Sequence, residues 1–241
     1  MESQQNPYVS PYVVSQSPDQ VRSEFYQKTY LHLALAIAAF VLLEAALFAI
    51  PGIEQKVFGL LGGSSYSWLI VLGLFMGASW IAEKWATSDT SRSMQYAGLG
   101  LYVVAEALIF LPLLLIASSY SGQNNLIGQA AIITLALFAG LTFVAFTTRK
   151  DFSFLGGMLK IGFFVAMGLI VASIFLGFNL GIWFSGAMVL FAGGSILYQT
   201  SNIIHHYRPE QYVAASLGLF ASVALLFWYI LRILMALSSN D

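Results

Sequence analysis

Cysteine and charge are what this sequence lacks. None of its 241 residues is a cysteine, which excludes disulfides, thiolate metal sites and cysteine nucleophiles. Only 9% of the residues are charged and 59% are hydrophobic, whereas an average soluble domain is roughly 25% charged. A net charge of −1 offers no basic face for nucleic acid. The composition therefore indicates a membrane protein with no nucleic-acid partner.

Apolar segments of membrane-spanning length fill almost all of the chain after residue 29. A hydrocarbon core ~30 Å thick needs ~20 helical residues, and a helix satisfies its own backbone hydrogen bonds inside the bilayer. The sequence therefore predicts an all-α bundle of seven transmembrane helices. The expected spans are Tyr30–Ile50, Trp68–Ala86, Gln95–Ser118, Gly128–Thr147, Leu155–Leu176, Gly181–Thr200 and Tyr212–Leu234.

Lysine and arginine are distributed unequally between the two sides of the predicted bundle. If the N-terminus is inside, the outer loops hold only Lys56, and Arg232 lies near the outer end of the last span. Because short loops rich in these residues stay in the cytoplasm, we expect the N-terminus inside and the C-terminus outside. The inner side holds Arg22, Lys28, Lys84, Arg92, Arg149, Lys150 and Arg208, with Lys160 just inside the fifth span.

Three regions are expected along the chain. Met1–Gln20 is rich in Gln, Ser, Pro, Asn and Tyr, a composition that cannot bury enough apolar area to offset its ordering entropy. Residues 1–29 are therefore predicted to be a disordered cytoplasmic tail. Residues 30–236 form the transmembrane domain, and residues 237–241 form a short external tail.

Two carboxyl groups fall within the predicted spans, where a charge costs roughly 2.5–3.5 kcal/mol on insertion scales. Glu106 is near the middle of the third span and Glu44 is in the outer half of the first. Each is either a hydrogen-bonded structural carboxyl or part of a proton or cation site. His205 and His206 follow the sixth span, where a solvated loop position is favoured over a pH sensor.

Motifs for catalysis are absent from the sequence. It has no His-Glu-x-x-His zinc helix, no Gly-x-Gly-x-x-Gly and no phosphate-binding loop. No histidine lies at the depth of Ser195 to act as its base. The sequence predicts neither a catalytic site, nor a metal site, nor a cofactor, so we do not expect an enzyme.

The turn between the fourth and fifth spans carries a family resemblance. Residues Thr147–Leu159 read TTRKDFSFLGGML, and Tyr198–His205 read YQTSNIIH. Both segments, with Pro112 in the third span, resemble the Bax inhibitor-1 family and its bacterial YccA-like branch. The residues of the family signature are Thr148, Arg149, Lys150, Asp151, Phe152, Gly156 and Gly157.

The resemblance implies two activities. Members of the YccA-like branch lie in the bacterial inner membrane, where they bind and modulate the ATP-dependent protease FtsH, which grips their N-terminal tail. Other members are pH-sensitive calcium leak channels gated by a carboxylate pair in the last two spans. The corresponding positions here are Gln199 and Ser222, neither of which is charged.

The leading hypothesis is therefore a multi-pass inner-membrane protein that modulates an FtsH-type protease in membrane-protein quality control. The alternative is a calcium or proton leak channel in which the usual aspartate pair is replaced, with Glu106 and Glu44 as a candidate acidic site.

Overall fold

A computed structural model describes residues 12–63, 66–89, 91–120 and 125–238. In these ranges every regular element is a helix, and seven are long and apolar enough to cross a membrane, which confirms the predicted all-α class. The seven are α1 (Asp19–Phe48), α3 (Ser67–Ala86), α4 (Arg92–Ser119), α5 (Leu126–Thr148), α6 (Leu155–Leu176), α7 (Gly181–His205) and α8 (Tyr212–Ser238). Shorter helices are η1 (Val14–Gln16), α2 (Ile53–Gly62) and η2 (Pro209–Gln211).

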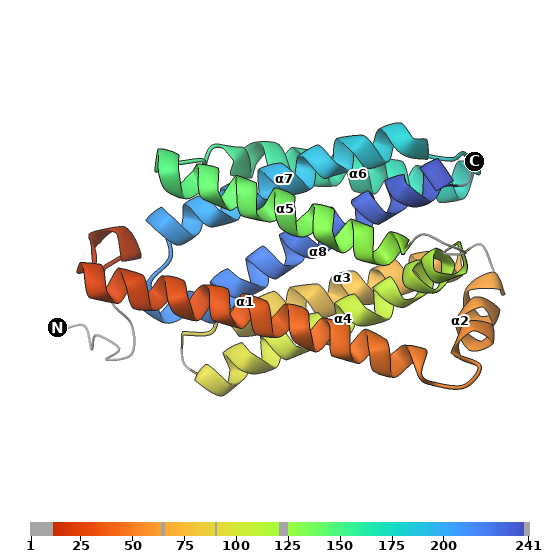
Figure 1. The fold of residues 1–241 in the computed structure, drawn as a ribbon, viewed down its shortest axis with the longest axis horizontal. Coiled ribbons are helices and arrows are strands. Elements are labelled where there is room, and N and C mark those ends of the chain that lie inside the picture. Colours follow the sequence, from red (N-terminus) through yellow and green to blue (C-terminus); the bar gives the residue numbers. More distant parts are fainter. Residues whose placement is uncertain (1–11, 64–65, 90, 121–124, 239–241) are drawn as a thin grey trace, which may run out of the picture.

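Helix α8 runs through the middle of the bundle. It packs against α1 and α4 on one side and against α5 and α7 on the other, while α3 pairs with α4 (Figure 1). Helix α6 lies at the periphery and packs chiefly on α7. The long helices therefore form two groups joined by α8, and the loops α3–α4, α5–α6 and α7–α8 lie at the same end as the start of α1 (Figure 1).

Aromatic side chains fill the contact between α1, α4 and α8. The Phe110 ring of α4 lies 5.3 Å from Phe40 of α1 and 4.9 Å from Trp228 of α8, measured between ring centroids. Both pairs are edge-to-face, the geometry favoured by the ring quadrupole. Pro112 is buried in α4, two residues beyond this cluster.

The N-terminal region differs from the prediction of a disordered tail through Thr29. Helix α1 already begins at Asp19, and η1 precedes it. Phe25 and Thr29 are buried on the helix face that continues through Leu33 and Ala36, since residues three or four apart share one face. This apolar stripe outweighed the polar composition on which the prediction relied. The part of the predicted tail in residues 1–11 lies outside the described residues.

Three further boundaries differ from expectation. The loop between α1 and α3 contains α2, whose first residue follows Gly52, a glycine with a positive φ of 71°. Helix α7 continues past the predicted end at Thr200 to His205. Helix α8 continues to Ser238, so only residues 239–241 of the predicted external tail remain, and they lie outside the described residues.

Candidate functional site

Residues 206–211, the connector between α7 and α8, meet all the other elements at the N-terminal end of the bundle. The turn between α5 and α6, the turn between α3 and α4, and the segment around η1 each hydrogen-bond to the connector or to His205 directly before it. Backbone groups at the end of a helix need such partners, because the last carbonyls of a helix have no hydrogen-bond donor within the helix. The connector is the place where sequence-distant parts of the chain are joined by polar contacts.

Asp151 of the signature turn is held by the connector and by α7. Its carboxylate lies 3.1 and 3.3 Å from Nε2 of His206, and the Ser201 hydroxyl donates to it at 3.4 Å. The same Ser201 oxygen accepts the backbone N–H of Phe152 at 2.8 Å. The family signature on one loop is thus fastened to the end of α7.

The ionisation of Asp151 reflects these contacts. The backbone N–H of Ser153, which donates to the carboxylate at 2.8 Å, is the largest cause that lowers the pKa of Asp151, to about 2. Partial desolvation opposes that shift, and His206 adds to it. Hydrogen bonds to a carboxylate favour its charged form, so Asp151 is an anion throughout the physiological range.

The remaining signature residues have different environments. Thr148 ends α5 and its hydroxyl donates to the Val144 carbonyl, and Arg149 follows it with a left-handed φ of 50°. Lys150 is exposed. Gly156 lies close to α7, since a Cβ on it would be 2.9 Å from the Tyr198 ring. A Cβ on Gly157 would meet nothing within 4 Å.

Charged groups hold the other side of the connector. Arg208 pairs with Asp89 on the α3–α4 turn and, through Nε, with Glu210 at 3.5 Å. Arg92, the first residue of α4, donates to the Glu210 carbonyl at 2.8 Å and lies over the Tyr212 ring, 4.8 Å from its centroid. These contacts tie the α3–α4 half of the bundle to the start of α8.

The segment before α1 covers the third side of the connector. The Val14 N–H donates to the Tyr207 carbonyl at 2.8 Å, and the Ser15 hydroxyl donates to the His205 carbonyl at 3.1 Å. The Val14 side chain is fully buried, which contributes on the order of 1.5–3 kcal/mol relative to exposure. This segment belongs to the folded bundle.

Gln199 and Ser222, the two family positions in the interior, both contact Gly218 of α8. A Cβ on Gly218 would lie 2.9 Å from the Gln199 side chain, and the Ser222 hydroxyl donates to the Gly218 carbonyl at 2.9 Å. Ser195 lies 2.8 Å from Ser222 and must donate to it, because the single Ser222 proton is already used. The structure therefore brings these positions to one turn of α8 with no carboxylate between them.

Glu106 and Glu44 are both buried, with exposed fractions of 5% and 6%. They lie on opposite sides of the Phe40–Phe110 contact, Glu44 one turn beyond Phe40 and Glu106 one turn before Phe110. Two helical turns correspond to an offset of about 11 Å along the bundle. The structure therefore does not bring the two carboxyl groups together.

His206 is the residue whose role the sequence interpretation underestimated. It is exposed, as a solvated loop position predicts, but its ring pairs with Asp151 across 55 residues of sequence. His205 is not in a loop, because it is the last residue of α7. The recognised segment Tyr198–His205 ends one residue before His206, so the adjacent histidines were the only available signal. Among the described residues, no three His, Cys, Asp or Glu side chains are grouped so as to hold a metal ion.

Seven apolar helices, with α8 in the middle, define a multi-pass membrane helix bundle. A protein-family model described as "Inhibitor of apoptosis-promoting Bax1" matches residues 22–240. The chain belongs to the Bax inhibitor-1 family and to its YccA-like branch.

Similar proteins include bacterial and eukaryotic members. "Bax inhibitor 1" of Schizosaccharomyces pombe is 27% identical over 233 residues, which cover 95% of this chain and 82% of the relative. A protein of Pseudomonas aeruginosa is 39% identical over 132 residues (52% and 58%). "Modulator of FtsH protease YccA" of Escherichia coli is 38% identical over 115 residues (47% and 52%). The match thus spans little more than half the length of the last two relatives.

Proposed function

We propose that this chain is a non-enzymatic protein of the bacterial inner membrane that binds and modulates an FtsH-type protease. The observation that carries the proposal is the similarity to a protein of one E. coli strain that is named as a modulator of FtsH protease, and to a protein of a second strain that is named an inner membrane protein. The N-terminus and the connector then face the cytoplasm, in agreement with the excess of lysine and arginine at that end.

The surface offered to a protease is the connector end of the bundle. There the N-terminal segment, the signature turn and the α3–α4 turn are tied to one short connector by the contacts of Val14, Asp151 and Arg208. A surface supported from three sides is pre-organised, which lowers the entropy cost of binding a partner. The bundle supplies this rigid surface, and the chain before α1 supplies the segment that a protease can grip.

The interior gives less support to an ion leak. A carboxylate pair can make a channel pH-sensitive, because like charges a few ångströms apart cannot both ionise. Gln199 and Ser222 are neutral, and Glu44 and Glu106 are separated by the Phe40–Phe110 contact. None of these residues forms a carboxylate pair, so we favour the protease modulator.

Co-purification after crosslinking tests the proposal. The full-length chain carries a C-terminal affinity tag and is crosslinked in bacterial membranes that contain FtsH. FtsH is expected in the eluate, at the level obtained with a known FtsH substrate treated in parallel. An unrelated seven-helix membrane protein with the same tag is the control. If the known substrate recovers FtsH and this chain does not, the proposed function is wrong.

A further inference from the structure

We propose that residues 12–17, here called the latch, regulate degradation of this chain by the protease to which it binds. Docked on the connector, the latch withholds its residues from the protease and lets the chain act as a bound modulator. Undocked, it lengthens the grippable tail and turns the chain into a substrate. This inference rests on the proposed function and concerns how that function is controlled.

The latch is held to the connector end through one face. The Val14 N–H and the Ser15 hydroxyl donate to the carbonyls of Tyr207 and His205, and the Val14 side chain is fully buried. Phe25 of α1, whose ring lies 6.5 Å from that of Tyr207, forms part of the same cluster of buried side chains. One buried side chain and two hydrogen bonds thus join the latch to the connector end of the bundle.

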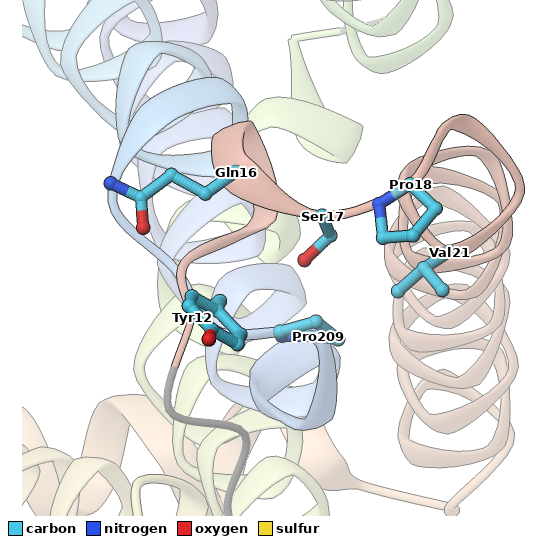
Figure 2. Close-up of a pocket in the computed structure, with 6 residues that line it drawn as sticks. All are labelled: Tyr12, Gln16, Ser17, Pro18, Val21 and Pro209. Carbon is cyan, nitrogen blue, oxygen red and sulfur yellow. The ribbon is translucent and has the colours of Figure 1, made fainter.

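The other face of the latch is open to solvent. A pocket of about 400 Å³ separates it from the start of α1, with Tyr12 and Pro209 on one side and Pro18 and Val21 on the other (Figure 2). The exposed side chain of Gln16 does not fill this space. Segments with few buried contacts and exposed hydrogen bonds open at low free energy, without unfolding the rest of the protein. The latch is thus suited to undock while the bundle stays folded.

Undocking changes the length of chain that a protease can reach. Within the latch, the backbone N–H groups of Gln16 and Ser17 donate to Val13 and Val14, so the segment is a compact turn. Released and extended, residues 12–17 add up to about 22 Å to whatever chain precedes them. We therefore expect this added length to decide whether the protease can begin to pull on the chain.

Docking also determines where a pulling force arrives. With the latch in place, tension on the N-terminus passes to the carbonyls of His205 and Tyr207. The connector is held in turn by the His206–Asp151 and Arg208–Asp89 pairs. A pull is therefore shared among three loops, whereas without the latch it acts on the first turn of α1 alone.

The test compares two variants of the full-length chain that carry the same new charge. Val14→Asp places a carboxylate at a fully buried position and undocks the latch, whereas Gln16→Asp places one on an exposed side chain two residues away. Val14→Ala is a milder variant without charge. Three quantities are measured: hydrogen exchange at residue 14, recovery of FtsH after crosslinking, and half-life in cells with active or proteolytically inactive FtsH.

We expect Val14→Asp to lose amide protection at residue 14 and still to recover FtsH. Its half-life should be about tenfold shorter, which corresponds to a change of 1.4 kcal/mol in the free energy difference between the docked and undocked states. Val14→Ala should lie between it and the wild type, and Gln16→Asp should match the wild type. The shortening must vanish when FtsH is inactive. Unchanged half-lives despite lost protection overturn the latch, as does shortening that persists without active FtsH. Failure of the wild type to recover FtsH instead overturns the proposed function.

Discussion

Helices α4 and α6 are equally apolar and yet have opposite places in the bundle. Their most apolar windows have mean hydropathies of 2.4 and 2.3, but 72% of the α4 window is buried inside the protein and only 6% of the α6 window. Lipid tails are as apolar as leucine side chains, so hydropathy places a helix in the membrane without choosing its neighbours. The difference lies in where small residues allow two helix backbones to approach closely.

The glycines of the two helices show how closely each helix approaches its neighbour. A Cβ on Gly98 of α4 would lie 2.5 Å from the Ala82 carbonyl oxygen and 2.6 Å from the Ala86 nitrogen, so α3 and α4 touch backbone to backbone. In α6, Gly156 meets only the Tyr198 ring of α7. Close contacts with backbone fix a helix more firmly than contacts with a side chain that can move.

The largest effect is expected where α4 meets α3. Gly98→Ala should destabilise the protein by about 3 kcal/mol or prevent folding, because the new methyl group overlaps backbone atoms that cannot move separately from their helix. Gly100→Ala is the matched control, since a Cβ there meets nothing within 4 Å. Thermal unfolding in detergent measures both variants. Equal melting temperatures for the two would refute close α3–α4 contact at Gly98.

A smaller effect is expected where α6 meets α7. Gly156→Ala should cost about 1–2 kcal/mol, because the Tyr198 ring must shift from a Cβ position only 2.9 Å away. Gly157→Ala, in open space one residue later, should be neutral or stabilise the helix by about 0.5–1 kcal/mol. Chemical denaturation of the two variants in mixed micelles provides the comparison. Destabilisation by Gly157→Ala but not by Gly156→Ala would contradict the contact between Gly156 and Tyr198.

The smallest effect is expected at the loop that joins α5 to α6. The pKa of Asp151 is about 2, below its ordinary value of 3.8, so its stabilising contribution is complete above about pH 4 and is lost as pH falls towards 2. Asp151→Asn should remove this pH dependence. The loss should be at most about 1 kcal/mol, because both partners of the pair are half exposed. Melting temperatures between pH 5 and pH 3 measure it, and parallel curves for wild type and variant would contradict the expectation.

Much of the fold could be predicted because membrane helices have a strong local signal. All seven spans were located, and their cores coincide with the observed helices. The first eleven residues of α1, Asp19–Thr29, were missed because they are polar in composition, although Phe25, Thr29 and Leu33 follow a helical spacing. Helix α2 was missed because a ten-residue helix in a loop gives no comparable signal. Orientation in the membrane remains a prediction from the charge distribution.

The candidate site was predicted only in part. The signature turn was recognised as a motif, but its partners His206 and Ser201 lie about 50 residues away and nothing local connects them. The latch could not be predicted either, since its bonds from Val14 and Ser15 to the connector span about 190 residues of sequence. Such pairings depend on how the helix ends meet, which single-sequence patterns do not encode.

Seven membrane crossings and uncharged residues at the two interior family positions can be read from the chain alone, because length, hydropathy and residue identity are local properties. The enclosure of α4, the outward position of α6, the separation of Glu44 from Glu106 and the docking of residues 12–17 on the connector follow from the packing of the helices. These outcomes depend on which helix faces approach within contact distance. In a bilayer, close packing and polar pairing decide that approach, since apolarity is common to every helix.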